Sequence, residues 1–248
     1  MRDGLLVVNK PQGMTSHDVV ALARRRLGTQ RIGHSGTLDP MARGVLILLV
    51  EGATRYQQAF QTCRKQYDAA IHLGVQTDTA DAWGTQTRTA PVPPLARSEV
   101  ETVLASLVGR LTQIPPVFSA VKVRGRPSYW WARRGTPMVA PPRTVEIMVL
   151  ELLELSPTRL SCRVVCSSGT YIRTLAEAIA NRLGTVGHVS ELVRRAVGPW
   201  GLAHSHEVPW LKIASVEEIR AALQPVSAEI SRSEISQSGK PAEMFRCA

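Results

Sequence analysis

Asp39 is the carboxylate whose surroundings best suit chemistry. It lies in the stretch RIGHSGTLDPMARGVLILLV, residues 31–50. Pro40 disfavours the helical region for the residue before it, so we expect Asp39 in extended backbone rather than on a helix face. A carboxylate held in this way can attack an electrophilic carbon or stabilise positive charge. A single loop Asp is more often a turn or capping residue, and the local sequence leaves both roles open.

Glycines and a buried strand would hold this carboxylate in place. Gly33, Gly36 and Gly44 permit tight turns and the close approach of another molecule. The apolar run Val45 to Val50 predicts a strand that is buried on both faces. A reactive group in a loop attached to such a strand is held still, as catalysis requires.

Arg173 is the second residue that its position singles out. It lies in GTYIRT, in the first turn of a predicted helix whose apolar side carries Ile172, Leu175 and Ile179 and which ends at Gly184. A cation in the first turn opposes the helix dipole. The sequence therefore predicts an anionic partner for Arg173, either a carboxylate or a phosphate.

Strands and helices alternate irregularly along the rest of the chain. Leu5 to Val8 predicts a strand, and the helix after it should begin near Thr15 and Asp18 and end at Gly28. The other expected segments are helical spacing at 51–65, a strand at 65–74, turns at 75–87, a helix with a capping box between Ser98 and Glu101, a hairpin of 145–155 with 160–166, a short element at 188–196 and a helix at 215–223. This pattern predicts an α+β fold with a large mixed, mostly antiparallel sheet flanked by helices.

Composition limits the partners and the compartment. The 248 residues carry a net charge of +10, which favours a polyanion, nucleic acid first and anionic membrane second. No apolar run approaches the roughly 20 residues that span a bilayer, and there is no signal-peptide pattern. The four cysteines form no CxxC pair, which is typical of reduced thiols in a cytoplasmic protein. The motifs HSHE and TDTAD lack a complete ligand set, so we expect no metal site.

A basic and aromatic stretch lies within the irregular region 114–143. Its pattern suits phosphate contact combined with stacking on bases or riboses, although a solvated loop with its aromatics turned to the core fits as well. The residues expected to bind RNA are Lys122, Arg124, Arg126, Tyr129, Arg133 and Arg134.

The stretch GHSGTLDPMARGVLIL, residues 33–48, resembles the catalytic motif of the TruB-type tRNA pseudouridine synthases, commonly written GHTGTLDPLATGVL. The single Asp of that motif is the nucleophile, and it corresponds to Asp39. Ser35, Met41 and Arg43 depart from the usual motif, but the Asp, the His and the glycines remain. The resemblance implies the pseudouridine synthase fold and isomerisation of uridine 55 in the T loop of tRNA, without a cofactor.

Further site residues follow from the resemblance alone. Tyr67 in KQYDAAIHLG would stack on the target uracil and take part in proton transfer, and Arg173 would pair with Asp39. His34 would fill the gap that the extruded nucleotide leaves. The residues implied to line the uracil pocket or support its floor are Tyr171, Leu192 and Lys10.

The resemblance also implies the domain plan. Residues 1–224 would form the catalytic domain, in which an RNA-binding insertion at about 117–143 folds over the T arm. Trp130 departs from the polar residue that is usual in this insertion. Residues 225–248 would be a tail in place of the usual PUA-type domain, and the protein would be a monomer. Two other functions stay open, a non-catalytic RNA-binding or RNA-folding module and a glycosidase-like hydrolase.

Overall fold

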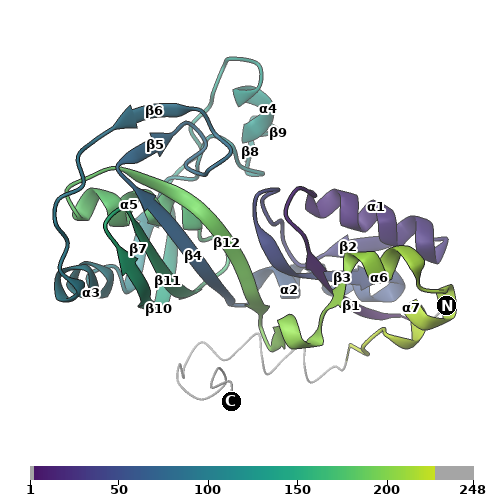
Figure 1. Ribbon diagram of the computed structural model, residues 1–248. Helices are drawn as coiled ribbons and strands as arrows, with labels where there is room; N and C mark the ends of the chain where they lie inside the picture. The colour runs from purple at the N-terminus through teal and green to yellow at the C-terminus, as the bar shows by residue number, and fades with distance from the viewer. Residues whose placement is uncertain (1–2, 227–248) are drawn as a thin grey trace. The chain divides into compact units, whose positions relative to one another are not determined.

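The structure is a computed structural model that describes residues 3–226 (Figure 1). The chain divides into two compact units, residues 1–66 with 193–248 and residues 67–192. Strands β4 (Lys65–Leu73) and β12 (Gly187–Val197) each begin in one unit and end in the other. The predicted domain boundaries stay a prediction, and residues 227–248 of the predicted tail lie outside the described residues.

The first unit contains the Asp39 loop. Its hydrogen-bonded strands follow the order β14-β1-β3-β12, and β2 also pairs with β3. The elements are β1 (Gly4–Lys10), α1 (Ser16–Leu27), β2 (Ile32–His34), β3 (Arg43–Val50), the 3₁₀ helix η1 (Glu51–Tyr56), α2 (Gln57–Thr62), β13 (Trp200–Gly201), the 3₁₀ helix η2 (Leu202–His204), β14 (His206–Glu207), α6 (Val208–Ile213) and α7 (Val216–Ala221).

Strands β1 and β3 are buried on both faces, as predicted for Val45 to Val50. One face packs against α1, α6 and α7 and includes Leu6 and Leu48. The other face includes Val7 and Ile47 and packs against Phe60 and Trp200. Because successive side chains of a strand alternate between its faces, two cores cover this pair of strands and fix the loop that leads into β3.

The predicted ends of α1 are confirmed. The Thr15 hydroxyl accepts a hydrogen bond from the Asp18 backbone N–H, and the Asp18 carboxylate accepts one from the Thr15 N–H, which completes a capping box. Gly28 ends the helix in the left-handed conformation at φ 66°. These caps fix the position of Ser16, the first residue of the helix.

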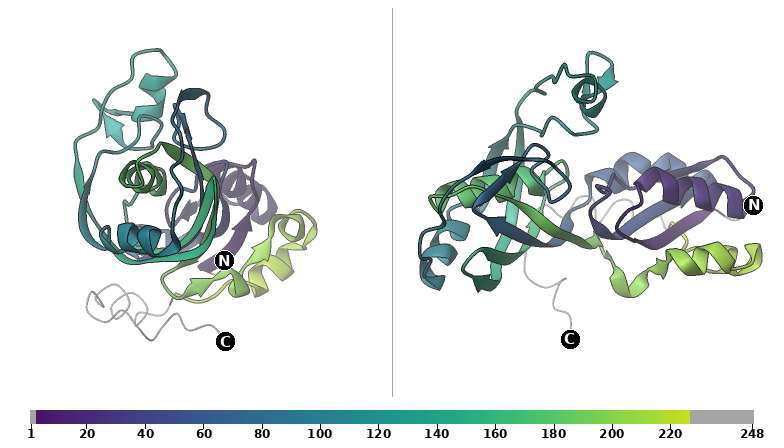
Figure 2. Two further views of the ribbon diagram at one scale, coloured as in Figure 1. Left: turned by 60° about the vertical axis from the view of Figure 1, so that its left-hand side comes forward. Right: turned by 45° about the horizontal axis from the view of Figure 1, so that its top comes forward.

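The second unit contains the strand order β12-β4-β11-β10-β7. In Figure 2, α5 lies in the curve that these strands form. The remaining elements of this unit are β5 (Val75–Thr77), β6 (Gln86–Thr89), α3 (Arg97–Ala105), β7 (Gly109–Gln113), β8 (Lys122–Val123), β9 (Arg126–Pro127), α4 (Ser128–Ala132), β10 (Arg143–Ser156), β11 (Arg159–Cys166) and α5 (Ile172–Arg182).

The hairpin of β10 and β11 and the apolar side of α5 agree with the sequence. β10 pairs antiparallel with β11 and with β7, whereas β3 and β12 are parallel, so the sheet is mixed. The predicted α+β class with a large, mostly antiparallel sheet is therefore confirmed. Within residues 3–226, no helix is both long enough and apolar enough to cross a bilayer.

Three local predictions were incomplete or wrong. Ser98 does not cap α3, because the helix begins after Ala96 and Glu101 instead pairs with Arg97 at 2.8 Å. Residues 75–89 form a β-hairpin, β5 with β6, rather than turns alone. The short element expected at 188–196 is the 11-residue strand β12. For the hairpin and for β12, the local pattern allowed two outcomes and strand pairing selected one.

Candidate active site

Asp39 is half-buried and lies in irregular backbone between β2 and β3, as the sequence predicted. Its carbonyl accepts a hydrogen bond from the Ala42 N–H at 3.0 Å, and the carbonyl of Pro40 accepts one from the Gly13 N–H at 2.9 Å. The loop is thus joined to the residue 11–14 turn as well as to β3. This backbone keeps the carboxylate beside buried structure while leaving it partly exposed.

Ser16 holds the residue that precedes Asp39. The buried Ser16 hydroxyl accepts a hydrogen bond from the Leu38 N–H at 2.8 Å and donates one to the Leu38 carbonyl at 3.3 Å. Because both bonds are buried, losing them would leave polar backbone groups without partners. The sequence predicts only the start of a helix at this position and gives no sign of this contact.

Arg194 of β12 also binds the backbone of this loop. Its Nε–H donates to the Val45 carbonyl at 2.7 Å, and its terminal nitrogens donate to the carbonyls of Thr37 at 3.3 Å and Gly36 at 3.1 Å. The side chain is only 1% exposed. The sequence analysis did not single out this arginine.

Lys10 lies in the first unit with Asp39 and is fully buried. Its ammonium group donates to the carbonyls of Pro11 at 3.0 Å and Met14 at 2.6 Å. Burial and then the charge of Arg194 lower the pKa of Lys10 to about 8, against an opposing attraction from Asp39. The role of Lys10 in supporting the floor of the site stays a prediction.

His34 lies at the end of β2 and is half-buried. Its Nδ1 accepts a hydrogen bond from the Gly36 N–H at 3.2 Å, which places the ring proton on Nε2. Burial, followed by the charge of Arg194, lowers the pKa of His34. The lowered pKa favours the neutral ring at pH 7, and the predicted stacking role of His34 stays a prediction.

In the second unit, Arg173 is buried in the first turn of α5. Its guanidinium donates to the carbonyls of Thr79 and Phe118, both at 2.9 Å. The carboxylate of Asp81 lies 3.8 Å from it. The sequence predicted an anionic partner but did not anticipate Asp81. The pairing of Arg173 with Asp39 stays a prediction.

Asp81 is itself held by its own turn. One carboxylate oxygen accepts hydrogen bonds from the Thr79 hydroxyl at 2.8 Å and the Trp83 N–H at 3.0 Å. The stretch TDTAD, which the sequence analysis set aside as an incomplete metal site, therefore positions an arginine. Among the described residues, no three His, Cys, Asp or Glu side chains gather as a metal site.

The other predicted pocket residues also belong to the second unit. Tyr171 is half-buried immediately before α5, and buried Gln113 accepts from its N–H at 3.0 Å and donates to its carbonyl at 3.3 Å. Tyr67 is half-buried in β4, and Leu192 is buried in β12. Gln113 was not anticipated, because a side chain that fixes a distant backbone leaves no local pattern.

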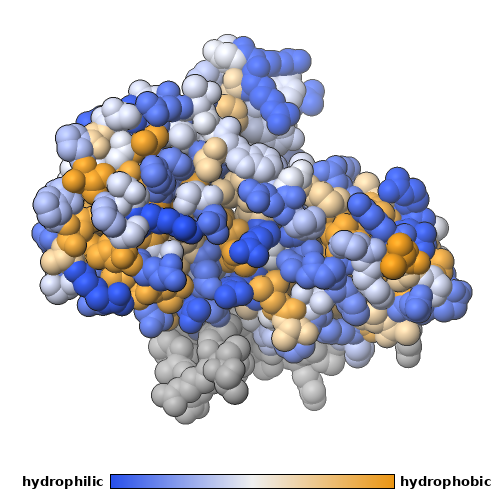
Figure 3. Space-filling model, in the orientation of Figure 1, coloured by the Kyte–Doolittle hydropathy of each residue, from blue (hydrophilic) through white to orange (hydrophobic). Residues whose placement is uncertain are grey.

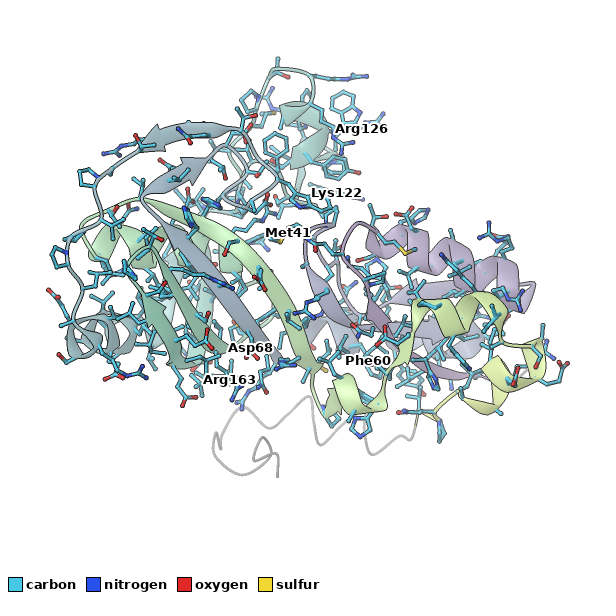
Figure 4. All side chains as sticks on the ribbon, viewed as in Figure 1. Met41, Phe60, Asp68, Lys122, Arg126 and Arg163 are labelled. Atoms are coloured by element: carbon cyan, nitrogen blue, oxygen red, sulfur yellow. The ribbon has the colours of Figure 1, made fainter. Side chains whose placement is uncertain are left out.

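The predicted RNA-binding residues lie in or next to the short elements β8, β9 and α4. Figure 3 shows strongly hydrophilic side chains over this segment, and Figure 4 labels Lys122 and Arg126. The guanidinium groups of Arg134 and Arg126 lie 3.8 and 5.5 Å from the centre of the Trp130 ring. Arg133 lies 5.5 Å from the centre of the Tyr129 ring, and Arg124 is exposed. Aromatic faces thus support three of these arginines.

Not every ion pair in this unit belongs to the candidate site. Asp68 of β4 and Arg163 of β11 come within 3.1 Å of each other, and both are labelled in Figure 4. This pair joins neighbouring strands. We therefore assign this ion pair to stabilisation of the sheet and give it no role in the reaction.

Solved structures share this fold. A chain in the crystal structure of a Cbf5-Nop10-Gar1 complex matches with a TM-score of 0.68 and 31% identity over 90% of this chain and 60% of that chain. A chain in the structure of an H/ACA RNP bound to a substrate RNA containing 2′-deoxyuridine matches with a TM-score of 0.65 and 28% identity, over 90% and 59%. The present chain spans about three-fifths of either. The fold is that of the pseudouridine synthases.

Sequence comparisons give the family. The family described as "TruB family pseudouridylate synthase (N terminal domain)" matches residues 24–172. The tRNA pseudouridine synthase B of Opitutus terrae is 41% identical over 224 residues, which cover 90% of this chain and 93% of that protein. The protein of the same name from Geobacillus kaustophilus is 46% identical over 207 residues, 81% of this chain and 73% of that protein. The chain belongs to the TruB family of pseudouridylate synthases.

Proposed function

We propose that this enzyme converts uridine 55 in the T loop of tRNA to pseudouridine, with Asp39 as its catalytic carboxylate. The observation that carries the proposal is the fixed loop around Asp39, in which buried side chains bind the backbone of the residues that directly precede the carboxylate, Gly36, Thr37 and Leu38. Catalysis by one positioned group requires such a fixed backbone. The names of the relatives, tRNA pseudouridine synthase B, support tRNA as the substrate.

The reaction breaks one bond to the ribose and makes another. As the N1–C1′ bond breaks, its electrons leave with the uracil and positive charge builds at C1′. The Asp39 carboxylate stabilises that charge or attacks C1′ covalently. After the uracil rotates, C5 bonds to C1′, the proton on C5 is lost and N1 takes up a proton. No water has to be activated, so a second carboxylate is not required.

We assign the other pocket residues to binding and positioning. Tyr67 stacks on the uracil and takes part in moving the C5 proton, while Tyr171 and Leu192 line the pocket. Arg173 forms an ion pair with Asp39. Asp81 keeps the guanidinium group of Arg173 in position for this pair. The neutral ring of His34 fills the gap left by the extruded nucleotide.

We propose that the segment 122–134 binds the T arm of the tRNA. Three of its exposed arginines, Arg126, Arg133 and Arg134, lie on aromatic faces, which leaves their N–H groups able to reach phosphate oxygens. The net charge of +10 favours the same partner. We further propose that the enzyme acts as a monomer in the cytoplasm.

Tritium release from a tRNA transcript carrying [5-³H]uridine tests the proposal. The native chain should release tritium from position 55, and Asp39→Asn should lower the single-turnover rate by at least about 10⁴-fold with RNA affinity unchanged. Asp3→Asn, which changes an exposed aspartate of the same unit, is the matched control and should keep native activity. Binding without tritium release would instead indicate an RNA-binding module, and an abasic site would indicate a hydrolase.

A further inference from the structure

Arg194 is the largest side chain that the described part of the chain buries completely. Burying a guanidinium is costly unless its N–H groups are satisfied. Here three carbonyl oxygens accept from it, those of Gly36, Thr37 and Val45. Two of these carbonyls belong to residues that precede Asp39 by three and two positions, and the third belongs to β3.

Gly44 explains why this arginine reaches the loop. Strands β12 and β3 pair in parallel with Arg194 opposite Gly44, which has φ 116°. A Cβ at residue 44 would collide with the backbone carbonyl oxygen of Arg194. The glycine therefore lets the two backbones approach closely, and the Arg194 side chain can extend beneath residues 36 and 37.

The chemistry of the contact requires a guanidinium. Its five N–H groups point in fixed directions within one plane, so a single side chain can bind several carbonyls that lie around it. An ammonium group at the same position carries the same charge but is a compact donor at the end of a flexible stem. A lysine would keep the charge and lose the planar set of hydrogen bonds.

We propose that Arg194 is a positioning residue for Asp39, which sets the place of the catalytic carboxylate by binding the backbone on its N-terminal side. This role rests on the proposed function. In this role Arg194 acts on Asp39 through the hydrogen bonds that it donates to the loop backbone. The loop is held between Arg194 on Gly36 and Thr37 and Ser16 on Leu38, so removing the guanidinium frees one of two supports.

The experiment compares Arg194→Lys, Arg194→Met and Arg25→Lys with the native chain. Arg25 is exposed on α1 in the same unit, so Arg25→Lys makes the same chemical change away from the loop. Each protein is assayed for single-turnover tritium release at saturating tRNA, for tRNA affinity and for amide hydrogen exchange. The exchange measurement follows residues 35–42 separately from β3, which serves as the internal reference.

Arg194→Lys should react about 10- to 100-fold more slowly than the native chain, because small displacements of a reacting group have effects of this size. Its tRNA affinity should be unchanged, and exchange should accelerate at residues 35–42 while β3 stays protected. Arg194→Met should show a larger loss, and Arg25→Lys should match the native chain. If Arg194→Met fails to fold, the lysine variant still decides the question.

Three results would overturn the proposal. Arg194→Lys could react as fast as the native chain, it could lose rate without faster exchange at residues 35–42, or exchange could accelerate equally in β3, which would make the role purely structural. The exchange readout does not need catalysis. If the native chain released no tritium, the proposed function would fail while the exchange comparison still tested whether Arg194 holds the loop.

Discussion

The carbonyls of Gly36, Thr37 and Leu38 accept hydrogen bonds from buried side chains, whereas three of the four arginines of the segment 122–134 lie over the rings of Tyr129 and Trp130. The first arrangement fixes a backbone, and the second supports groups that keep their outward N–H atoms. A reacting carboxylate needs a fixed position. Side chains that bind a phosphate backbone need instead to extend from the surface to the phosphate oxygens. Four substitutions test this contrast.

The largest expected effect is a loss of stability at Gly44, where strands β3 and β12 approach each other closely. Gly44→Ala would place a Cβ at φ 116° against the backbone of Arg194, so strain and overpacking should add. We expect the free energy of unfolding to fall by about 2–5 kcal/mol. Urea unfolding monitored by circular dichroism measures this. A loss below about 0.5 kcal/mol, the range of ordinary surface substitutions, would show that β3 and β12 need no such approach.

The second expected effect comes from losing the hydrogen bonds between Ser16 and the Leu38 backbone. Ser16→Ala leaves a buried backbone N–H without its acceptor, so we expect a loss of about 1–3 kcal/mol in the free energy of unfolding. Ser98→Ala is the control, because Ser98 is exposed and does not cap α3, and it should stay within about 0.5 kcal/mol. Equal losses for the two variants would mean that the loop is not held more tightly than the surface.

The segment 122–134 should respond through RNA affinity rather than stability. Trp130→Ala removes the face on which Arg126 and Arg134 lie, and exposed cation–π contacts are worth roughly 0.5–1 kcal/mol each, so tRNA binding should weaken about 3- to 10-fold. Trp130→Phe should weaken binding less. Filter binding gives the affinity, and the single-turnover rate at saturating tRNA should not change. A changed rate would mean that this segment also affects the chemical step, which would contradict the contrast drawn between it and the Asp39 loop.

The last prediction concerns the pH dependence of stability. The pKa of Lys10 is about 8 in the folded chain against an ordinary 10.5, so between these values the unfolded chain binds a proton that the folded chain does not. The free energy of unfolding attributable to Lys10 should therefore rise as pH increases from 8 to 10.5, by less than about 1.4 kcal/mol per pH unit. Lys10→Met should lack this rise. Unfolding curves of both proteins across the window measure the difference, which should not vary with pH if Lys10 is ordinarily solvated.

Much of the local structure could be predicted because its causes are local. Thr15, Asp18 and Gly28 define the two ends of α1 by capping chemistry alone. The apolar run before Glu51 required a strand buried on both faces. The pattern at Ser98 and Glu101 shows the limit, because the same spacing was satisfied by an ion pair to Arg97 and the helix began elsewhere.

The sequence by itself determined which residue is catalytic in our proposal, since Asp39 lies in a motif whose residue types and spacing are specific to one family. Only the tertiary structure decided what holds that residue and its predicted partner. Arg194 and Ser16 reach the Asp39 loop, and Asp81 reaches Arg173, across long separations in the chain. Hydrogen bonds to backbone carbonyls leave no trace in the identity of the residues that accept them, so no local pattern could have revealed these supports.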